Sequence, residues 1–379
     1  MINKVILIPD SFKGTMSSSL VCDIMEKVIK EYYPNAEILK IPVADGGEGS
    51  VDAFIQATGG TKRFAQVKGP YFDQMESFYG VLEDEKTAVI EMAACAGLPL
   101  VGDEKDPSKT TTFGVGQLIL EAVKNGAEHI IMGLGGSATN DCGTGAAAAC
   151  GVTFYDKNKK PFIPVGGTLK SIHMIDATTI NPLLKNVTIT TMCDIDNPLY
   201  GINGAAHIFG PQKGASPAMV EELDKGLRHV SEIVEKDLGI KSENMPGAGA
   251  AGGMGYGMHV FFGSTLQMGI ETVLDTVNFD ELVKNADYIF TGEGKIDSQS
   301  IRGKVVIGVA RRAKKENVPV IAIVGDIGDG IEPVYDMGVS AVFSINRVAV
   351  DFKHAKLRSQ NDLALTMDNL IRFMKNITN

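Results

Sequence analysis

Short apolar runs alternate with amphipathic helical stretches at both ends of the chain. Near the N-terminus, Val5–Ile8 and Glu37–Val43 have the length and composition of strands, and the helical stretches after them end near Tyr32 and Ala57. The same alternation returns after about Phe279. There it predicts the strands Asp287–Phe290, Pro319–Val324 and Ser340–Ser344 and the helices Val305–Lys315, Ile331–Met337 and Leu363–Lys375. Strands that alternate with helices in this way are typical of a parallel sheet.

The middle of the chain has a different pattern. Phe64–Lys68, Glu76–Glu83 and Thr87–Met92 have the pattern of antiparallel strands, and the longest amphipathic helix is expected at Pro217–Leu238. Because both ends share one pattern and the middle has another, we predict an α/β protein with two domains. Residues 1–65 and 281–379 would form a parallel α/β domain, and residues 66–280 a mixed α/β domain inserted into it.

The composition limits the classes of function. At 379 residues the chain is longer than a typical single domain, which supports two domains. A net charge of −10 argues against binding to nucleic acid or to a membrane surface. The five cysteines form no CxxC pair, which favours packed thiols and a cytoplasmic location. The apolar run near the N-terminus is only about five residues long, so we expect no membrane span.

A glycine-rich stretch, Met132–Gly145, gathers candidate ligand-binding groups in the sequence MGLGGSATNDCGTG. It follows a short apolar run and precedes four alanines, which predicts a strand, a loop and the start of a helix. Glycines let a ligand approach the main chain, and free N–H groups at a helix start bind anions. We therefore predict a site for a phosphate or a carboxylate. The alternative is a plain turn that packs a helix onto a sheet. Pro246–Gly257 is expected to form a second glycine loop.

Acidic residues follow four predicted strands of the parallel sheet. In open parallel sheets, ligands bind outside the carboxyl ends of the strands. Crowded carboxylates repel one another unless a cation lies among them, and Mg²⁺ with phosphate oxygens suits such a site. The residues expected along this edge are Asp10, Asp45, Glu48, Glu293, Asp297 and Asp326.

Two lysines lie in the same predicted loops. Lys13 follows Asp10 by three residues, and Lys295 lies in the sequence GEGKID, so that either could meet a phosphate. Arg302 and Lys304 are close by in the sequence but are equally well explained as solvated residues. The chain has no Walker A loop, because neither of its Gly-Lys pairs near these strands is followed by Ser or Thr.

Six stretches carry a family resemblance: PDSFKGTMSS, VADGGEGSVDAF, GLGGSATND, CDIDNPLYG, PGAGAAGGMGYG and TGEGKIDSQSIRGK. Together, in this order and across nearly the whole chain, they resemble the bacterial glycerate kinase family of the glycerate 2-kinase type. The resemblance implies phosphorylation of D-glycerate by ATP with Mg²⁺, generally at the 2-hydroxyl. It also implies a flavodoxin-like domain with a second α/β domain inserted. Two positions depart from the family pattern. Cys142 replaces a glycine, and Lys295 replaces an arginine, which keeps the charge but loses a bidentate contact.

The expected site residues fall into three groups. Asp194 is the expected base for the substrate hydroxyl, with Asp10 as the second candidate, and Lys13 and Lys295 would offset the charge of the transferred phosphoryl group. The expected metal ligands are Asp45, Glu48, Glu293 and Asp297. The expected contacts to substrate or phosphate are Ser11, Gly135, Gly136, Ser137, Asn140, Asp141, Asn197, Gly249, Gly252, Gly292 and Gly294.

Several alternatives stay open. We expect a substrate cleft between the two domains, but either glycine loop could bind ATP or glycerate. The acceptor could be the 3-hydroxyl or a related small hydroxy acid, and the chain could form a homo-oligomer. GLGGSAT also resembles a loop of the galactokinase and homoserine kinase superfamily, which the other five stretches do not fit. A non-catalytic regulator that binds small anions is a further alternative, although it would gain nothing from so many carboxylates.

Overall fold

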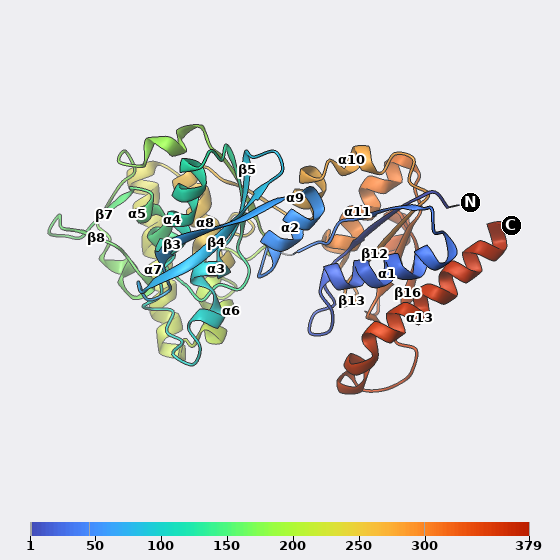
Figure 1. Ribbon diagram of the computed structural model, residues 1–379. Helices are drawn as coiled ribbons and strands as arrows, with labels where there is room; N and C mark the ends of the chain where they lie inside the picture. Colours follow the sequence, from blue (N-terminus) through green and yellow to red (C-terminus); the bar gives the residue numbers. More distant parts are fainter. Residues whose placement is uncertain (1, 45, 299, 379) are drawn as a thin grey trace. The chain divides into compact units, whose positions relative to one another are not determined.

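The chain separates into two compact units in the computed structural model, which describes residues 2–44, 46–298 and 300–378 (Figure 1). The first unit consists of residues 1–44, 56–58 and 270–379, and the second of residues 45–55 and 59–269. In Figure 1 the first unit therefore combines the blue N-terminal segment with the orange and red C-terminal segments.

The first unit contains a five-stranded parallel sheet with the strand order β16-β14-β12-β1-β2. Taken in chain order, this is the 2-1-3-4-5 arrangement of flavodoxin-like sheets. A two-stranded ribbon, β13 with β15, extends from two of the loops. The strands are β1 (Lys4–Pro9), β2 (Glu37–Lys40), β12 (Tyr288–Gly292), β13 (Lys295–Ile296), β14 (Val320–Val324), β15 (Asp326–Ile327) and β16 (Val339–Ser344).

Helices of the first unit cover apolar strands. The middle strands β12 and β14 are buried except for Tyr288 at the start of β12, as expected for a sheet with helices on both faces. Ser17 caps α1 by accepting a hydrogen bond from the Leu20 N–H, and α1 packs beside α13 (Figure 1). The helices are α1 (Ser18–Tyr32), α9 (Gly269–Thr276), α10 (Phe279–Leu282), α11 (Val305–Ala313), α12 (Pro333–Asp336) and α13 (Phe352–Thr378). Helix α2 (Ser50–Thr58) is divided between the two units.

The second unit contains a mixed six-stranded sheet with the order β11-β10-β6-β5-β4-β3. The hairpin strands β3, β4 and β5 are antiparallel, whereas β5, β6, β10 and β11 run parallel to one another. Its strands are β3 (Gly60–Lys68), β4 (Gln74–Leu82), β5 (Thr87–Glu91), β6 (His129–Gly133), β10 (Thr188–Met192) and β11 (Thr265–Gln267). A separate three-stranded sheet contains β7 (Thr153–Tyr155), β8 (Pro161–Phe162) and β9 (Met174–Asp176).

Two apolar clusters hold the second unit together. One lies between the mixed sheet and α4 and includes Ile90, Leu118 and Met132, and the other packs α7 against Phe154 and Tyr256. The helices are α3 (Ala93–Ala96), α4 (Phe113–Lys124), α5 (Thr144–Ala149), α6 (Ala205–Phe209), α7 (Pro217–Leu238) and α8 (Ala250–Phe262). Among the described residues, no helix has the length and apolar character needed to cross a membrane.

The predicted fold class is confirmed, and most predicted elements are found within a few residues of their expected positions. Two predictions need correction. The end of the second glycine loop, Pro246–Gly257, is helical: α8 is assigned from Ala250, but Ala251–Gly253 have left-handed backbone angles, so its uninterrupted part starts at Met254. The closing helix begins at Phe352 rather than Leu363. The predicted domain ranges stay a prediction. The compact units divide the chain earlier, because residues 60–65 belong to β3 of the mixed sheet.

Candidate active site

The carboxyl edge of the parallel sheet brings two predicted acidic residues together. Strands β1 and β12 are neighbours and end at Pro9 and Gly292, and Asp10 and Glu293 follow them directly. The Asp10 N–H donates to the Gly292 carbonyl at 2.8 Å. The Ser11 N–H donates to Asp10 Oδ1 at 2.6 Å, so Ser11 orients the carboxylate through its main chain. The parallel topology therefore places these carboxylates at one edge, as the pattern of strands predicted.

Glu293 is buried although it is acidic. Its side chain is only 5% exposed, and Oε1 has no hydrogen-bond partner among the described residues. Burial raises the pKa of Glu293 to about 7; a hydrogen bond with Ser300 and the charge of Lys304 oppose this shift, while Asp10 and Asp297 add to it. A buried carboxylate oxygen without a partner is unfavourable, and such groups gather at functional sites. This oxygen is available to a cation or to a proton.

The residues around Glu293 fit a Mg²⁺ ion that also binds phosphate. Within the described ranges, no group of three or more His, Cys, Asp or Glu residues is arranged to hold a metal by itself. Mg²⁺ commonly takes only one or two carboxylates and completes its shell with water and substrate phosphates. Glu293, with its unpartnered Oε1, and Asp297 fit that chemistry. Glu48 is exposed and belongs to the second unit, and Asp45 lies outside the described residues.

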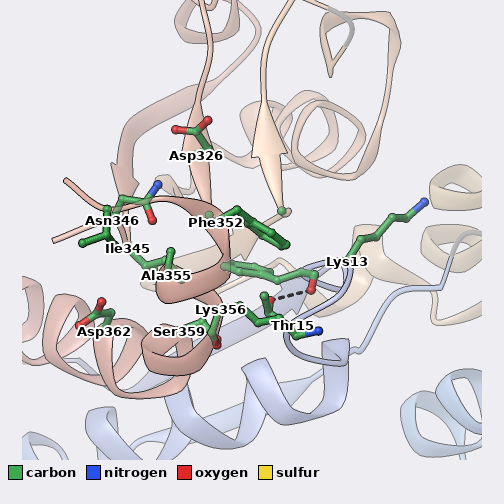
Figure 2. A pocket seen from close by; sticks show the side chains of 14 residues that line it. Lys13, Thr15, Asp326, Ile345, Asn346, Phe352, Ala355, Lys356, Ser359 and Asp362 are labelled. Atoms are coloured by element: carbon green, nitrogen blue, oxygen red, sulfur yellow. Dashed lines mark hydrogen bonds between the residues drawn. The ribbon is translucent and has the colours of Figure 1, made fainter. Parts of the chain in front are cut away.

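A pocket of about 320 Å³ opens in the first unit beside the same edge (Figure 2). Lys13 and Thr15 line it from the loop after β1, and Phe352 and Lys356 from α13. The Phe352 side chain is 66% exposed. Figure 2 shows the exposed Lys13 side chain pointing away from the other labelled residues. The remaining lining residues are Phe12, Gly294, Gly325, Asp326, Ile345, Asn346, Val350, Ala355, Ser359 and Asp362.

Gly294 and Lys295 lie where two loops come close. A Cβ atom on Gly294 would lie 3.3 Å from the Lys13 main-chain nitrogen, a tight contact that favours a small residue there. Lys295 is exposed and lies in the ribbon strand β13, where it pairs with Asp326 of β15. Gly292 closes β12, and a Cβ there would lie 2.0 Å from the Ile323 carbonyl oxygen. These contacts account for both glycines through packing, and their predicted contact with a ligand stays a prediction.

In the second unit, the loop after β6 is built around a buried lysine that the sequence analysis missed. Lys213, the last residue of a short 3₁₀ helix (Pro211–Lys213), is only 3% exposed. Its Nζ donates to the Thr139 carbonyl at 2.6 Å and to Ser137 Oγ at 3.2 Å. Ser137 Oγ also lies 3.0 Å from Thr139 Oγ1. The sequence signal was weak, since Lys213 is one of many lysines and differs from them mainly in lying between glycines in GPQKGAS.

Asp141 is the structural centre of this loop. It is fully buried, and its carboxylate accepts hydrogen bonds from the Thr112 N–H and Oγ1 at 2.7 and 2.8 Å. It also accepts from the N–H groups of Gly143 and Gly145, at 3.1 and 3.3 Å. Burial raises the pKa of Asp141, and these hydrogen bonds act in the opposite direction. Because four donors already surround the carboxylate, Asp141 orders the loop; its predicted contact with a ligand stays a prediction.

Several glycines predicted to contact a ligand have local reasons for being glycine. A Cβ on Gly135 would lie 2.4 Å from the Gly47 Cα atom, and a Cβ on Gly249 would lie 2.3 Å from the Pro198 carbonyl oxygen. Gly136 has a φ of +74°, and Gly252 has a φ of +70°. A Cβ on Gly252 would lie 2.0 Å from the Thr139 carbonyl oxygen, so Gly252 permits the close approach of α8 to this loop.

The expected base, Asp194, follows the end of β10 in the same unit as the glycine loop. Its side chain is exposed, and Oδ1 accepts a hydrogen bond from the Gly269 N–H at 2.7 Å. Asn197 Nδ2 donates to the Asn203 carbonyl at 2.9 Å, which fixes the turn after Asp194. Asp194 is therefore an oriented carboxylate that a substrate hydroxyl can reach. The nearby cysteines are packed thiols, since burial raises the pKa of Cys193 to about 11 and that of Cys150 to about 12.

Comparisons with known proteins cover nearly the whole chain. A family model described as the glycerate kinase family matches residues 5–375. Glycerate 2-kinase from Escherichia coli is 48% identical over 343 residues, which are 90% of this chain and 90% of that protein. Glycerate kinase from Halalkalibacterium halodurans is 46% identical over 344 residues, again 90% of each chain.

A solved structure is similar along its full length. The crystal structure assigned as a glycerate kinase 2 from Salmonella typhimurium has a TM-score of 0.88 and 39% sequence identity, and the match covers 100% of both chains. The family model and the relatives thus span both compact units and every stretch that carried the resemblance in the sequence. The chain belongs to the glycerate kinase family.

Proposed function

We propose that this protein phosphorylates D-glycerate at the 2-hydroxyl, with ATP as the phosphoryl donor, to give 2-phospho-D-glycerate. The observation that carries the proposal is the match with Escherichia coli glycerate 2-kinase, at 48% identity over 90% of each chain. The buried carboxylate of Glu293 beside Asp10 at the carboxyl edge of the parallel sheet supports it, because phosphoryl transfer requires groups that position phosphates and neutralise charge.

The proposed roles follow from the position of each residue. Asp194 would accept the proton of the substrate hydroxyl, because its carboxylate is exposed and held by the Gly269 N–H. Glu293 and Asp297 would hold Mg²⁺, which when bound would neutralise charge on the phosphate oxygens. Lys13, exposed on the loop after β1, and Lys295, exposed in the ribbon strand β13, would offset the negative charge that the phosphoryl group carries.

Three expectations extend this proposal. A reaction at the 3-hydroxyl, or with a related small hydroxy acid, is the main alternative for the acceptor. We also expect a cytoplasmic enzyme, since the five cysteines are free thiols. A homo-oligomer remains an expectation from the sequence.

One assay tests the reaction itself. Purified protein is incubated with ATP, Mg²⁺ and either D-glycerate, L-glycerate or glycerol, and ADP is measured. We expect ADP formation that depends on D-glycerate, and a phosphorus NMR spectrum that shows the 2-phosphate ester. A spectrum of the 3-phosphate ester would establish the alternative acceptor, and the absence of glycerate-dependent ADP would refute the proposal.

A substitution tests the proposed base. Asp194→Asn keeps the shape of the side chain but removes its ability to accept a proton, so we expect turnover to fall by about 100-fold or more with the fold intact. Asp196→Asn is the matched control, because Asp196 is an exposed aspartate two residues along the chain. Near-normal turnover in Asp194→Asn would remove Asp194 from the mechanism.

A further inference from the structure

Lys213 is a buried cation without a close counter-charge. Nζ hydrogen-bonds to the Thr139 carbonyl and to Ser137 Oγ, and within the described residues its third ammonium hydrogen has no partner. No carboxylate of the described residues lies within 4.0 Å of Nζ. A buried ammonium without an anion is unfavourable. An anion bound at this position would offset that cost.

Asp141 does not supply that anion. Its charge acts on Lys213 at longer range, and its carboxylate oxygens accept hydrogen bonds from Thr112, Gly143 and Gly145. Burial lowers the pKa of Lys213 to about 7, and the charge of Asp141 opposes this shift only in part. The direction of the shift shows that burial outweighs the nearest carboxylate, so an anion that binds here would restore the charged form.

Asn140 adds a second unsatisfied group to the same segment. It follows Thr139, which accepts the shorter of the two hydrogen bonds from Lys213, and it is fully buried. Both amide atoms, Nδ2 and Oδ1, lack partners among the described residues, so the conclusion holds whichever way the amide is oriented. A buried amide left without partners is unfavourable, and it requires one acceptor and one donor to be satisfied.

We propose that Lys213 and Asn140 form the recognition site for the hydroxy-acid substrate: the Lys213 ammonium binds the carboxylate, and the Asn140 amide binds a hydroxyl group. The inference rests on the proposed function and answers which loop binds which substrate. The glycine loop after β6 binds D-glycerate, and ATP binds elsewhere.

The Asn140 amide needs both a hydrogen-bond acceptor and a donor, and this requirement distinguishes a hydroxy acid from a phosphate as its ligand. At neutral pH the phosphates of ATP are acceptors only, so they would satisfy Lys213 and Asn140 Nδ2 but leave Oδ1 without a donor. D-glycerate has a carboxylate that accepts and hydroxyl groups that donate. Ser137 Oγ, at 3.2 Å, makes the longer of the two contacts with Nζ, so its reorientation gives the carboxylate access to the ammonium.

Binding calorimetry tests the proposal without turnover. D-glycerate is titrated into the wild-type protein and into Lys213→Met, which keeps the length of the side chain but removes the charge. We expect the affinity of Lys213→Met to be about 10- to 100-fold lower, because a hydrogen bond to a charged group is lost. Lys225→Met is the matched control, since Lys225 is an exposed lysine that pairs with Glu222 in the same unit.

Two further measurements distinguish D-glycerate from ATP as the anion that binds at Lys213. In the first, titration of ATP must give the same affinity in wild type and Lys213→Met. In the second, Asn140→Ala must raise the KM for D-glycerate about 10-fold and leave the KM for ATP unchanged. Equal D-glycerate affinity in wild type and Lys213→Met would overturn the proposal, and so would a loss confined to ATP. If the wild type forms no phosphoglycerate, the proposed function fails instead.

A measurement on the wild type covers the case in which Lys213→Met does not fold. Because burial lowers the pKa of Lys213 to about 7, the affinity for D-glycerate should fall about tenfold per pH unit as the pH rises above that value. D-glycerate stays ionised throughout this range, and Asp141 is the charged group that acts on Lys213. An affinity that does not change between pH 7 and pH 9 would contradict the proposal.

Discussion

Glu293 and Lys213 are an acid and a base whose burial moves their pKa values toward about 7 from opposite directions. Glu293 lies in the loop that follows β12, whereas Lys213 is the last residue of a 3₁₀ helix, and their neighbours differ. Further carboxylates, Asp10 and Asp297, act on Glu293, whereas Lys213 is surrounded by a carbonyl and hydroxyls. Burial penalises whichever form is charged, so both groups can be restored by a ligand of the opposite charge. The first unit is thereby suited to a cation and the second to an anion.

The largest effect is expected from removing the charge of Glu293. Glu293→Gln should lower kcat/KM by about 100- to 1,000-fold, or about 3 to 4 kcal/mol, because one carboxylate near the transferred phosphate is lost. Steady-state kinetics at saturating Mg²⁺ measures this. Glu316→Gln is the control, because Glu316 is an exposed acid of the same unit. Equal activity in both variants would show that Glu293 plays no part in the reaction.

A smaller effect is expected from the contact between α8 and the glycine loop. Gly252→Ala should destabilise the protein by about 2 to 4 kcal/mol, because the new methyl group would overlap the Thr139 carbonyl oxygen at a φ of +70°. Gly239→Ala separates the two causes. Gly239 has the same φ but no atom within 4 Å of its Cβ position, so a loss of only about 1 to 2 kcal/mol is expected there. Urea unfolding of both variants measures the difference, and equal losses would show that the overlap is relieved.

The two buried groups should give stability profiles with opposite slopes. The folded state binds fewer protons at Lys213 than the unfolded state between pH about 7 and 10.5, so this lysine makes stability rise with pH in that range. The folded state binds more protons at Glu293 between pH 4.5 and about 7, so stability falls with rising pH there. Each slope is at most about 1.4 kcal/mol per pH unit.

These slopes are measured as differences between wild type and variant in Mg²⁺-free buffer. Urea unfolding of the wild type minus Lys213→Met should show the rise above pH 7, and the wild type minus Glu293→Gln should show the fall below it. A flat difference for either pair would mean that burial does not shift that pKa as described.

The smallest effect is expected at an exposed ion pair. Lys225→Met should change the free energy of unfolding by less than about 0.5 kcal/mol, because exposed pairs such as Lys225 with Glu222 are screened by water and salt. The same urea titration measures it. A loss as large as that of Gly252→Ala would show that the region around α7 is more tightly coupled than its exposure indicates.

Local pattern was enough to predict most of the fold. The buried strands β1, β12 and β14 are short apolar runs, and α7 has both predicted ends, since Ser216 caps it and Gly239 follows it. The parallel topology then placed Asp10 and Glu293 at one edge, because strands joined by helices run in the same direction. The end of the stretch Pro246–Gly257 was mispredicted, because high glycine content indicated a loop where packing around Met254 and Tyr256 maintains a helix.

The sequence by itself determined the α/β class, the family and the loops in which polar groups gather, because these depend on residues close together in the chain. Tertiary structure alone decided which of those groups are buried and which have partners. Lys213 lies 74 residues from Thr139, and apart from its flanking glycines nothing local distinguishes it from an exposed lysine such as Lys225. Asp141 carries a conspicuous charge, yet Thr112, Gly143 and Gly145 already surround it. The unsatisfied amide belongs to its neighbour Asn140, and the buried cation without a close counter-charge is Lys213. Hydrogen-bond satisfaction depends on residues distant in the chain, and only the folded protein brings them together.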